Sequence, residues 1–420
     1  MVFPNLMNSR VLILCVLVLA TRNYQACAFR NYKTWTPSNP NNPKHDETSF
    51  RGLCADSITT QGYKCQEFEV ITKDGYILSI QRIPEGRSEL SSNVTKKETV
   101  VIQHGIMMDG SSWFMNSPSQ NLPMILADDG FDVWITNTRG SKYSRNHTSL
   151  DPSNEKYWDW SWDELVSDEM PAIIDFVFNQ TGQKINYLGH SLGTLVALVS
   201  LSEGNWINQV KSVALLSPIA YLKNMKTKLG VMSANYVYGK KFTPRDITEF
   251  DPKGQRVLDF VDGICNHYGL NCNNLFSALT GENCCLDEAA FVRFMKVEPQ
   301  PTSNKNVIHI AHIFLSDSLA KFDYGRPHLN RFHYGQPKPP IYDLSNIPND
   351  IPIFMSYGGH DALSDPVDVN KLLSIHFQNH DKGKLSVQFI EEYAHADYMM
   401  AVNANELVYK NVSSFFKQKF

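Results

Sequence analysis

The sequence comprises 420 residues, of which 42% are hydrophobic and 20% are charged, and its formal net charge is -4 at pH 7. A chain of this length can bury a large core, and its charge balance is that of an ordinary globular protein. The composition therefore excludes a small scaffold held together by disulfides, and it gives no indication of a nucleic-acid partner.

The first 28 residues have the features of a signal peptide. Arg10 precedes an apolar run, Val11–Ala20, and small residues follow it up to Ala28. The run is too short to span a bilayer comfortably, so we expect cleavage near Ala28 and no transmembrane segment in the mature chain. Residues 29–48 are rich in Asn, Pro and Lys and are predicted to be flexible.

Entry into the secretory pathway permits disulfides, because the compartments of that pathway are oxidising. The mature chain keeps six cysteines: Cys54, Cys65, Cys265, Cys272, Cys284 and Cys285. Their separations favour a bridge between Cys54 and Cys65 and a second cluster closed among the last four, with the pairing left open. The adjacent Cys284 and Cys285 are not expected to bond to each other.

Four Asn-X-Ser/Thr sequons predict N-linked glycans, at Asn93, Asn146, Asn179 and Asn411. Together with the signal peptide, they predict a protein that is secreted or delivered to a vacuole or lysosome.

Strand and helix patterns alternate from residue 65 to residue 219. Residues 65–82 contain two alternating stretches around an Asp-Gly turn, which predicts a β-hairpin. Apolar runs predict buried strands at 99–103, 131–137, 185–188 and 210–219, and helices are predicted at 122–127, 163–178 and 192–201. The aromatic stretch Tyr157, Trp158, Trp160 and Trp162 is expected to pack between helix and sheet. The alternation is typical of an α/β fold.

The alternation stops between residues 220 and 342. This stretch has scattered helical patterns and a loop-rich end but no convincing buried strand, so we interpret it as a mostly helical cap, or lid, laid over the strand ends. The alternation resumes in residues 343–420, with strands near 351–359 and 385–390 and helices near 366–377 and 405–416. The core is therefore expected to be discontinuous, formed by residues 29–219 and 343–420.

A candidate nucleophile, Ser191, lies between a predicted strand and a predicted helix. It is the centre of the pentapeptide Gly189-His190-Ser191-Leu192-Gly193, which has the pattern G-x-S-x-G. In this setting the pattern is typical of a sharp turn that lifts the serine hydroxyl clear of the sheet, and the glycines would permit the turn.

Polar loops follow the last two predicted strands, at the sheet edge where catalytic groups of α/β folds gather. Asp361 lies in the first loop and His395 in the second, so Ser191, Asp361 and His395 have the chain order nucleophile, acid, base of an α/β-hydrolase. His395 would take the serine proton, and Asp361 would orient the imidazole. Weaker candidates are Asp365 for the acid and His360, His376 or His380 for the base.

Two backbone amides are expected to stabilise the oxyanion of an acyl-transfer reaction. One belongs to Leu192, which follows the nucleophile, and the other to Ile106, in the loop after the first buried strand. His309 and His312 form an H-x-x-H pair without the Glu of a zinc-protease motif, so no metal is predicted there. We expect no cofactor, because no nucleotide or flavin motif is present.

Five motifs in order give the chain its resemblance to a known family: Gln103-His-Gly-Ile, Asn137-Thr-Arg-Gly, Gly-His-Ser-Leu-Gly, Gly-Gly-His-Asp and His395-Ala-Asp-Tyr. The chain resembles the acid lipase family of gastric and lysosomal lipases from about Cys54 almost to its C-terminus, and plant triacylglycerol lipases most of all. The resemblance implies an α/β-hydrolase fold with a mostly helical cap, cleavage of neutral-lipid esters, and a triad of Ser191, Asp361 and His395. Mammalian members commonly carry Gln where this chain has Leu192.

The expected activity is hydrolysis of fatty-acyl esters of neutral lipids, above all triacylglycerol, at an oil-water or membrane interface. The alternatives are a carboxylesterase, a sterol-ester hydrolase or an acyltransferase. A lipid-binding protein without turnover would lack a member of the triad, and no member is missing from the sequence.

Overall fold

The computed structural model describes residues 52–87, 96–227, 231, 243, 246–254 and 275–420. The predicted signal peptide, the stretch 29–48, the sequon at Asn93, and Cys265 and Cys272 lie outside the described residues. No helix within the described ranges is long and apolar enough to span a membrane.

A nine-stranded sheet forms the centre of the molecule, with the strand order β1-β2-β4-β3-β6-β7-β10-β11 and β5 paired with β2. The β1–β2 hairpin is antiparallel, as is its pairing with β4, whereas every pair from β4 to β11 is parallel. The strands are β1 (Gln66–Ile71), β2 (Tyr76–Ile83), β3 (Thr99–Gln103), β4 (Asp132–Ile135), β5 (Asn146–His147), β6 (Ile185–His190), β7 (Val210–Leu216), β10 (Ile353–Gly358) and β11 (Leu385–Ile390). The hairpin and the six longer strands that the sequence predicted are confirmed. The two-residue β5 was missed, because so short a strand has no periodicity.

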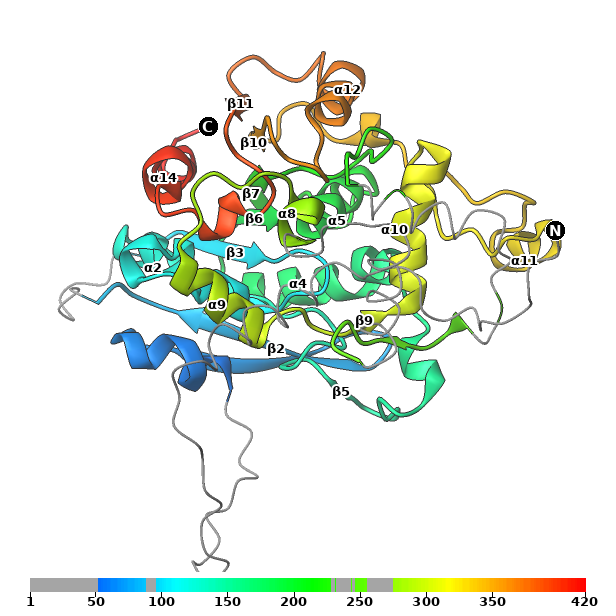
Figure 1. Ribbon diagram of the computed structural model, residues 1–420, viewed down its shortest axis with the longest axis horizontal. Coiled ribbons are helices and arrows are strands. Elements are labelled where there is room, and N and C mark those ends of the chain that lie inside the picture. The colour runs from blue at the N-terminus through cyan, green and yellow to red at the C-terminus, as the bar shows by residue number, and fades with distance from the viewer. Residues whose placement is uncertain (1–51, 88–95, 228–230, 232–242, 244–245, 255–274) are drawn as a thin grey trace, which may run out of the picture.

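Helices cover both faces of the sheet (Figure 1). The α-helices are α2 (Leu122–Asp128), α3 (Trp162–Glu164), α4 (Met170–Thr181), α5 (Leu192–Ser202), α12 (Pro366–His376), α13 (Asp397–Met400) and α14 (Lys410–Phe416). A π-helical turn, η7 (Leu165–Glu169), joins α3 to α4, and another, η11 (Asn405–Tyr409), leads into α14. Further short helical turns are η2 (Cys54–Ile58), η3 (Thr59–Gln61), η4 (Gly110–Phe114), η5 (Pro118–Gln120), η6 (Glu155–Trp158) and η10 (Leu344–Asn346). The helices predicted from the sequence are therefore present.

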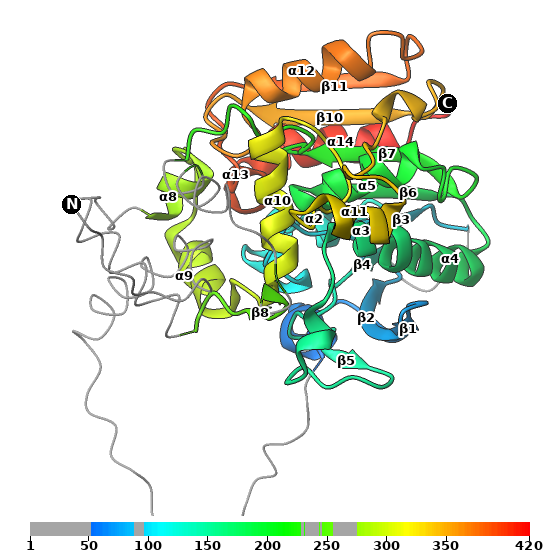
Figure 2. The ribbon, with the colours of Figure 1, turned by 90° about the vertical axis from the view of Figure 1, so that its right-hand side faces the viewer.

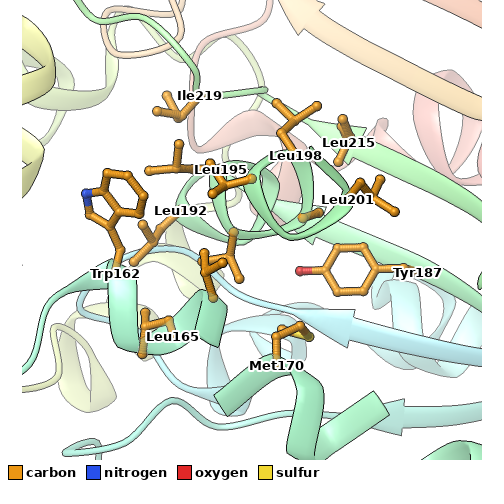
Figure 3. Close-up of a cluster of buried hydrophobic side chains, with 14 of the residues drawn as sticks. Trp162, Leu165, Met170, Tyr187, Leu192, Leu195, Leu198, Leu201, Leu215 and Ile219 are labelled. Carbon is orange, nitrogen blue, oxygen red and sulfur yellow. The ribbon is translucent and has the colours of Figure 1, made fainter. Parts of the chain in front are cut away.

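Two hydrophobic clusters lie on opposite faces of the sheet. Neighbouring residues of β3 belong to different clusters. Val101 packs in the cluster of α4 and α5, whereas Val100 packs in the cluster of α2 and α14. This alternation follows from the pleat of a strand that is covered on both faces. The first cluster surrounds α5, every residue of which is buried (Figure 3). The same cluster takes in the aromatic stretch that the sequence predicted to be packed: Tyr157, Trp158, Trp160 and Trp162.

The stretch between β7 and β10 contributes four described helices and a two-stranded sheet. Their bounds are β8 (Glu249–Phe250), α8 (Leu275–Thr280), α9 (Glu288–Val297), β9 (Thr302–Ser303), α10 (Asn304–Ser316) and α11 (Pro327–Tyr334). The sequence shows no convincing buried strand here, so the pairing of the two-residue strands β8 and β9 was not predicted. In Figure 2, α8, α9 and α10 lie beside the core, and α10 contributes Ile313 and Phe314 to the first hydrophobic cluster.

The structure contains two disulfides among the described residues. Cys54 is bonded to Cys65 across a Cα–Cα distance of 5.5 Å, as predicted. Cys284 is bonded to Cys285, so the prediction that these neighbours do not pair was wrong. That prediction assumed the usual spacing of half-cystines, whereas here the chain turns around Asp397, whose carboxylate accepts hydrogen bonds from the N–H groups of both cysteines.

Candidate active site

The loop between β6 and α5 holds Ser191 in a conformation that few side-chain-bearing residues adopt. Its φ is 54° and its ψ is -118°, outside the favoured regions for L-residues. The Ser191 N–H donates a hydrogen bond to the carbonyl of Leu216 in β7, at 3.1 Å, which anchors the turn to the sheet. Strain of this kind persists where the surrounding structure enforces it, and it is concentrated at functional sites.

The two glycines of the pentapeptide serve close packing rather than an unusual backbone angle. Neither Gly189 nor Gly193 has a positive φ, so the expectation that they supply the turn is replaced by a steric reason. A Cβ at Gly189 would lie 2.7 Å from the backbone of Gly193, and a Cβ at Gly193 would lie 2.8 Å from the carbonyl oxygen of Gln103. Helix α5 can approach β6 and β3 this closely only without these side chains.

Asp361 and His395 lie in the loops after β10 and β11 and are in direct contact. The Nδ1 atom of His395 is 3.1 Å and 3.0 Å from the two carboxylate oxygens of Asp361, and both side chains are buried. Burial alone would raise the pKa of Asp361, but the adjacent His395 and the N–H group of Leu363 lower this pKa overall. The N–H group of Ser364 donates to the same carboxylate, at 2.8 Å. The arrangement can therefore hold an ionised carboxylate against one nitrogen of an imidazole.

The other imidazole nitrogen of His395 is available. Its Nε2 atom is buried and has no hydrogen-bond partner in the described structure, Ser191 included. The ring lies beside the turn of Ser191, because His190 contacts it with a ring-centroid distance of 4.8 Å and places its own Nε2 atom 3.1 Å from the His395 carbonyl oxygen. Hydrogen bonds between a nucleophile and its base are often long without substrate and shorten in the complex.

Residues 280–286 connect the loop of Asp361 to the loop of His395, and sequence reasoning did not find this connection. The carbonyl oxygen of Thr280 accepts hydrogen bonds from the N–H of His395, at 3.0 Å, and of Ala362, at 3.4 Å. Gly281 forms an isolated β-bridge with Asp361, and a Cβ at Gly281 would lie 1.9 Å from the carbonyl oxygen of His360. These contacts join backbone atoms to backbone atoms, so the types of the residues involved give little indication of them.

The two predicted oxyanion donors line one hollow. Ile106 and Leu192 border this small hollow, together with Thr302 and Asn306 from the stretch between β7 and β10. Within the described part of the chain, neither backbone amide donates a hydrogen bond. Two unpaired N–H groups beside a serine can accept the charge of a tetrahedral intermediate.

The weaker acid and base candidates have other contacts. Asp365 caps α12 by accepting a hydrogen bond from Val367 N–H, at 2.8 Å, and its carboxylate is 2.8 Å from Lys226 Nζ. His360 is exposed to solvent. His376 bonds to Tyr221 Oη and His380 to the carbonyl oxygen of Ile351, so neither lies against an acid of the site.

The H-x-x-H pair is part of a packed region. His309 is buried, stacks on Trp162 with a ring-centroid distance of 4.1 Å, and bonds to Ser161 and to the Ala320 carbonyl oxygen. Burial lowers the pKa of both His309 and His312 to about 3, which keeps them neutral. Among the residues that the structure describes, no group of three potential metal ligands comes together.

Comparisons with known proteins agree on the fold. A model of the partial alpha/beta-hydrolase lipase region matches residues 54–117, and one of the alpha/beta hydrolase fold matches residues 98–253. A solved structure described as a lipase in its open form superposes with a TM-score of 0.51 at 14% identity, covering 84% of this chain and 98% of that one. At this identity the likeness concerns the fold alone.

Curated relatives match almost the whole chain. Triacylglycerol lipase 2 of Arabidopsis thaliana is 48% identical over 373 residues, which cover 89% of each chain. Triacylglycerol lipase 1 of the same plant is 34% identical, covering 87% of this chain and 91% of that one. Gastric triacylglycerol lipase of Homo sapiens is 31% identical, covering 86% and 90%. With this identity over this length, the chain belongs to the acid lipase family of α/β-hydrolases, the family of gastric and plant triacylglycerol lipases.

Proposed function

We propose that this chain is a serine lipase that hydrolyses fatty-acyl esters of neutral lipids, with triacylglycerol as its main substrate. The observation that carries the proposal is the buried Asp361–His395 pair, with a free Nε2 atom, beside the strained Ser191 turn. The printed names of the relatives support the choice of triacylglycerol.

In the first half of the proposed reaction, Ser191 Oγ attacks the ester carbonyl while His395 Nε2 takes the hydroxyl proton. Asp361 holds the imidazole in the required tautomer and stabilises the cation that forms. The amides of Ile106 and Leu192 bind the oxyanion. Collapse of the intermediate breaks the ester bond, and His395 returns the proton to the departing alcohol, leaving an acyl-enzyme.

Water then hydrolyses the acyl-enzyme. His395 removes a proton from the attacking water, and the second tetrahedral intermediate releases the fatty acid while the proton returns to Ser191. Every step uses side chains and amides of this chain.

The stretch 220–342 is proposed to act as the cap and lid that selects acyl chains at the lipid surface. Support comes from its position between β7 and β10 and from Thr302 and Asn306, which border the hollow beside Ile106 and Leu192. Exchange of the cap with that of a relative should change the preferred chain length of the substrate, while short soluble esters are still hydrolysed. An unchanged preference would contradict this role.

Secretion, or delivery to a vacuole or lysosome, and N-glycosylation are proposed with it. The sequons at Asn146, Asn179 and Asn411 support the glycans, because all three asparagines are exposed.

Release of fatty acid from a triolein emulsion, from cholesteryl oleate and from a soluble butyrate ester tests the proposal. The wild type should turn over triolein strongly, and Ser191→Ala should lose this activity. Ser200→Ala should keep it, because the hydroxyl of Ser200, a buried residue of α5, has no hydrogen-bond partner in the described structure. Turnover of the soluble ester alone would favour a carboxylesterase, and preference for cholesteryl oleate a sterol-ester hydrolase. Transfer of the acyl group to an added alcohol in preference to water would favour an acyltransferase.

A further inference from the structure

His104 follows β3 directly, is buried, and uses each ring nitrogen once. Its Nδ1 atom is 2.8 Å from the carbonyl oxygen of Gly105, and its Nε2 atom is 3.1 Å from the backbone nitrogen of Thr138. A carbonyl oxygen can only accept and an amide N–H can only donate, so the contacts assign one tautomer. Nδ1–H donates to Gly105, and Nε2 accepts from Thr138.

The neutral ring that this tautomer requires is maintained by its surroundings. Burial lowers the pKa of His104 to about 4, against an ordinary value near 6.5. A protonated ring would direct a second N–H group at the N–H of Thr138 and lose that hydrogen bond. At pH values well above 4, both contacts can therefore persist together.

The Gly105 carbonyl that His104 holds belongs to the same peptide unit as the Ile106 N–H. The peptide bond between them is trans, because the only cis bond among the described residues joins Glu298 to Pro299. In a planar trans peptide the C=O and N–H groups point in opposite directions. A hydrogen bond that fixes the Gly105 carbonyl therefore fixes the direction of the Ile106 N–H.

Within the described residues, no other group holds this peptide unit. The Gly105 carbonyl accepts no backbone N–H, and the Ile106 N–H has no acceptor. The loop has already left the sheet, since β3 ends at Gln103, and Met107 has a φ of 52°. The direction of the Ile106 N–H thus depends on the imidazole next to it.

We propose that His104 is a positioning residue of the active site, which aims the Ile106 amide at the oxyanion, and that the Thr138 amide selects the tautomer that does so. This inference rests on the proposed function, because it assigns Ile106 as an oxyanion donor. Its chemical effect is preorganisation: an N–H group already in place costs no rearrangement when the charge develops.

Two substitutions of His104 separate its two contacts. In His104→Asn the side-chain NH₂ can reach the position of Nδ1 and donate to Gly105, but nothing accepts from Thr138. In His104→Gln the side-chain oxygen can reach the position of Nε2 and accept from Thr138, but nothing donates to Gly105. We expect kcat for a soluble butyrate ester to fall less than about 10-fold in the Asn variant and about 100-fold in the Gln variant, with KM little changed in both.

The rate at which a phosphonate ester labels Ser191 provides a second readout, since its tetrahedral adduct places an oxygen in the same hollow. This rate should fall in the same order, and thermal unfolding should show that both variants are folded. Equal losses in the two variants, or wild-type kcat in the Gln variant, would overturn the proposal. In the wild type, imidazole ¹⁵N shifts at pH 6 must show His104 protonated at Nδ1; protonation at Nε2 would overturn it even if neither variant folds.

Failure of the proposed function would give a different result. In that case the wild type itself would lack ester turnover, or Ser191→Ala would retain it.

Discussion

Gly105, a residue without a side chain, lies next to Ser191. A Cβ at Gly105 would lie 3.0 Å from Ser191 Cβ and 3.4 Å from its Oγ. The proposed nucleophile and the loop of the proposed oxyanion donor are therefore too close together to admit a methyl group at Gly105 without a shift, and both depend on the local backbone. We therefore expect the activity to be sensitive to the addition of one methyl group at this position.

Gly105→Ala should consequently lower kcat by about 10- to 100-fold, because the added methyl displaces the Ile106 amide or the serine hydroxyl from its position for attack. Steady-state hydrolysis of a soluble butyrate ester measures the effect. Gly204→Ala is the matched control, since a Cβ there has only one neighbour within 4 Å, at 3.9 Å, and lies beyond the opposite end of α5 from Ser191. Alanine would be strained at this φ of 76°, so the variant should be less stable than the wild type but have an unchanged kcat.

Asp361 and Asp365 both lie in the loop between β10 and α12, and their contacts in the structure differ. Asp361→Asn should lower kcat by about 10⁴-fold, because an amide no longer holds the productive tautomer of His395 or stabilises its cation. Asp365→Ala should cost about 0.5 to 2 kcal/mol of stability through the lost cap of α12 and leave most of the activity. Loss of turnover in the Asp365 variant alone would show that the assignment of the acid is wrong.

At the scale of elements, residues 280–286 bind two core loops together. Asp397, two residues after His395, is fully buried, and its carboxylate accepts hydrogen bonds from the N–H groups of Ala394, Cys284 and Cys285, at 2.8, 3.2 and 3.3 Å. The loop of His395, the proposed base, is therefore attached through one side chain to the stretch between β7 and β10.

Asp397→Asn should loosen this attachment, because a neutral amide has one acceptor atom for three N–H donors. We expect a loss of about 1 to 3 kcal/mol in the free energy of unfolding and a lower kcat through a displaced His395. Denaturant unfolding and ester hydrolysis together measure both effects. Glu392→Gln, at an exposed position of the same loop, should change neither; a similar loss there would mean that the loop tolerates no change of charge at all.

The elements also show how far sequence reasoning reaches. Strands such as β3 and β6 were predictable because their apolar runs are long enough to have a pattern, and the Ser191 turn because it joins such a strand to a helix. The β8–β9 pairing, the Cys284–Cys285 bond and the contacts of Thr280 were not. They depend on the course of the backbone, which residue types at these positions do not encode. The sequence reasoning included His104 only in the motif Gln103-His-Gly-Ile and gave its side chain no role.

At the scale of the whole molecule, buried titratable groups make stability depend on pH. Burial first, and the neighbouring Asp109 second, raise the pKa of Glu298 well above its ordinary value, and the side chain is completely buried. The unfolded chain releases this proton above about pH 4.3, whereas the folded chain keeps it to higher pH. The contribution of Glu298 to stability is therefore present below about pH 4.3 and is lost as the pH rises towards its folded pKa.

Glu298→Gln should remove this loss of stability at higher pH, because a glutamine side chain does not titrate. The free energy of unfolding of the variant should be close to that of the wild type at pH 4 and should exceed it progressively as the pH rises, by at most about 1.4 kcal/mol per pH unit. Scanning calorimetry between pH 4 and pH 8 gives the comparison. Glu288→Gln, at an exposed position of α9, should give a constant difference. A constant difference for Glu298→Gln as well would mean that the folded protein holds this carboxyl ionised.

The core is assembled from two distant parts of the chain, since β10 pairs with β7 across the whole stretch between them. Ribosomes make proteins from the N-terminus, so the turn of Ser191 can form while the loops of Asp361 and His395 are still unmade. If the chain is secreted as proposed, a nascent chain that crosses a membrane would carry the proposed nucleophile without its base. Competence to cleave lipid is then expected only when the last strands join the sheet, which would protect the membrane until that point.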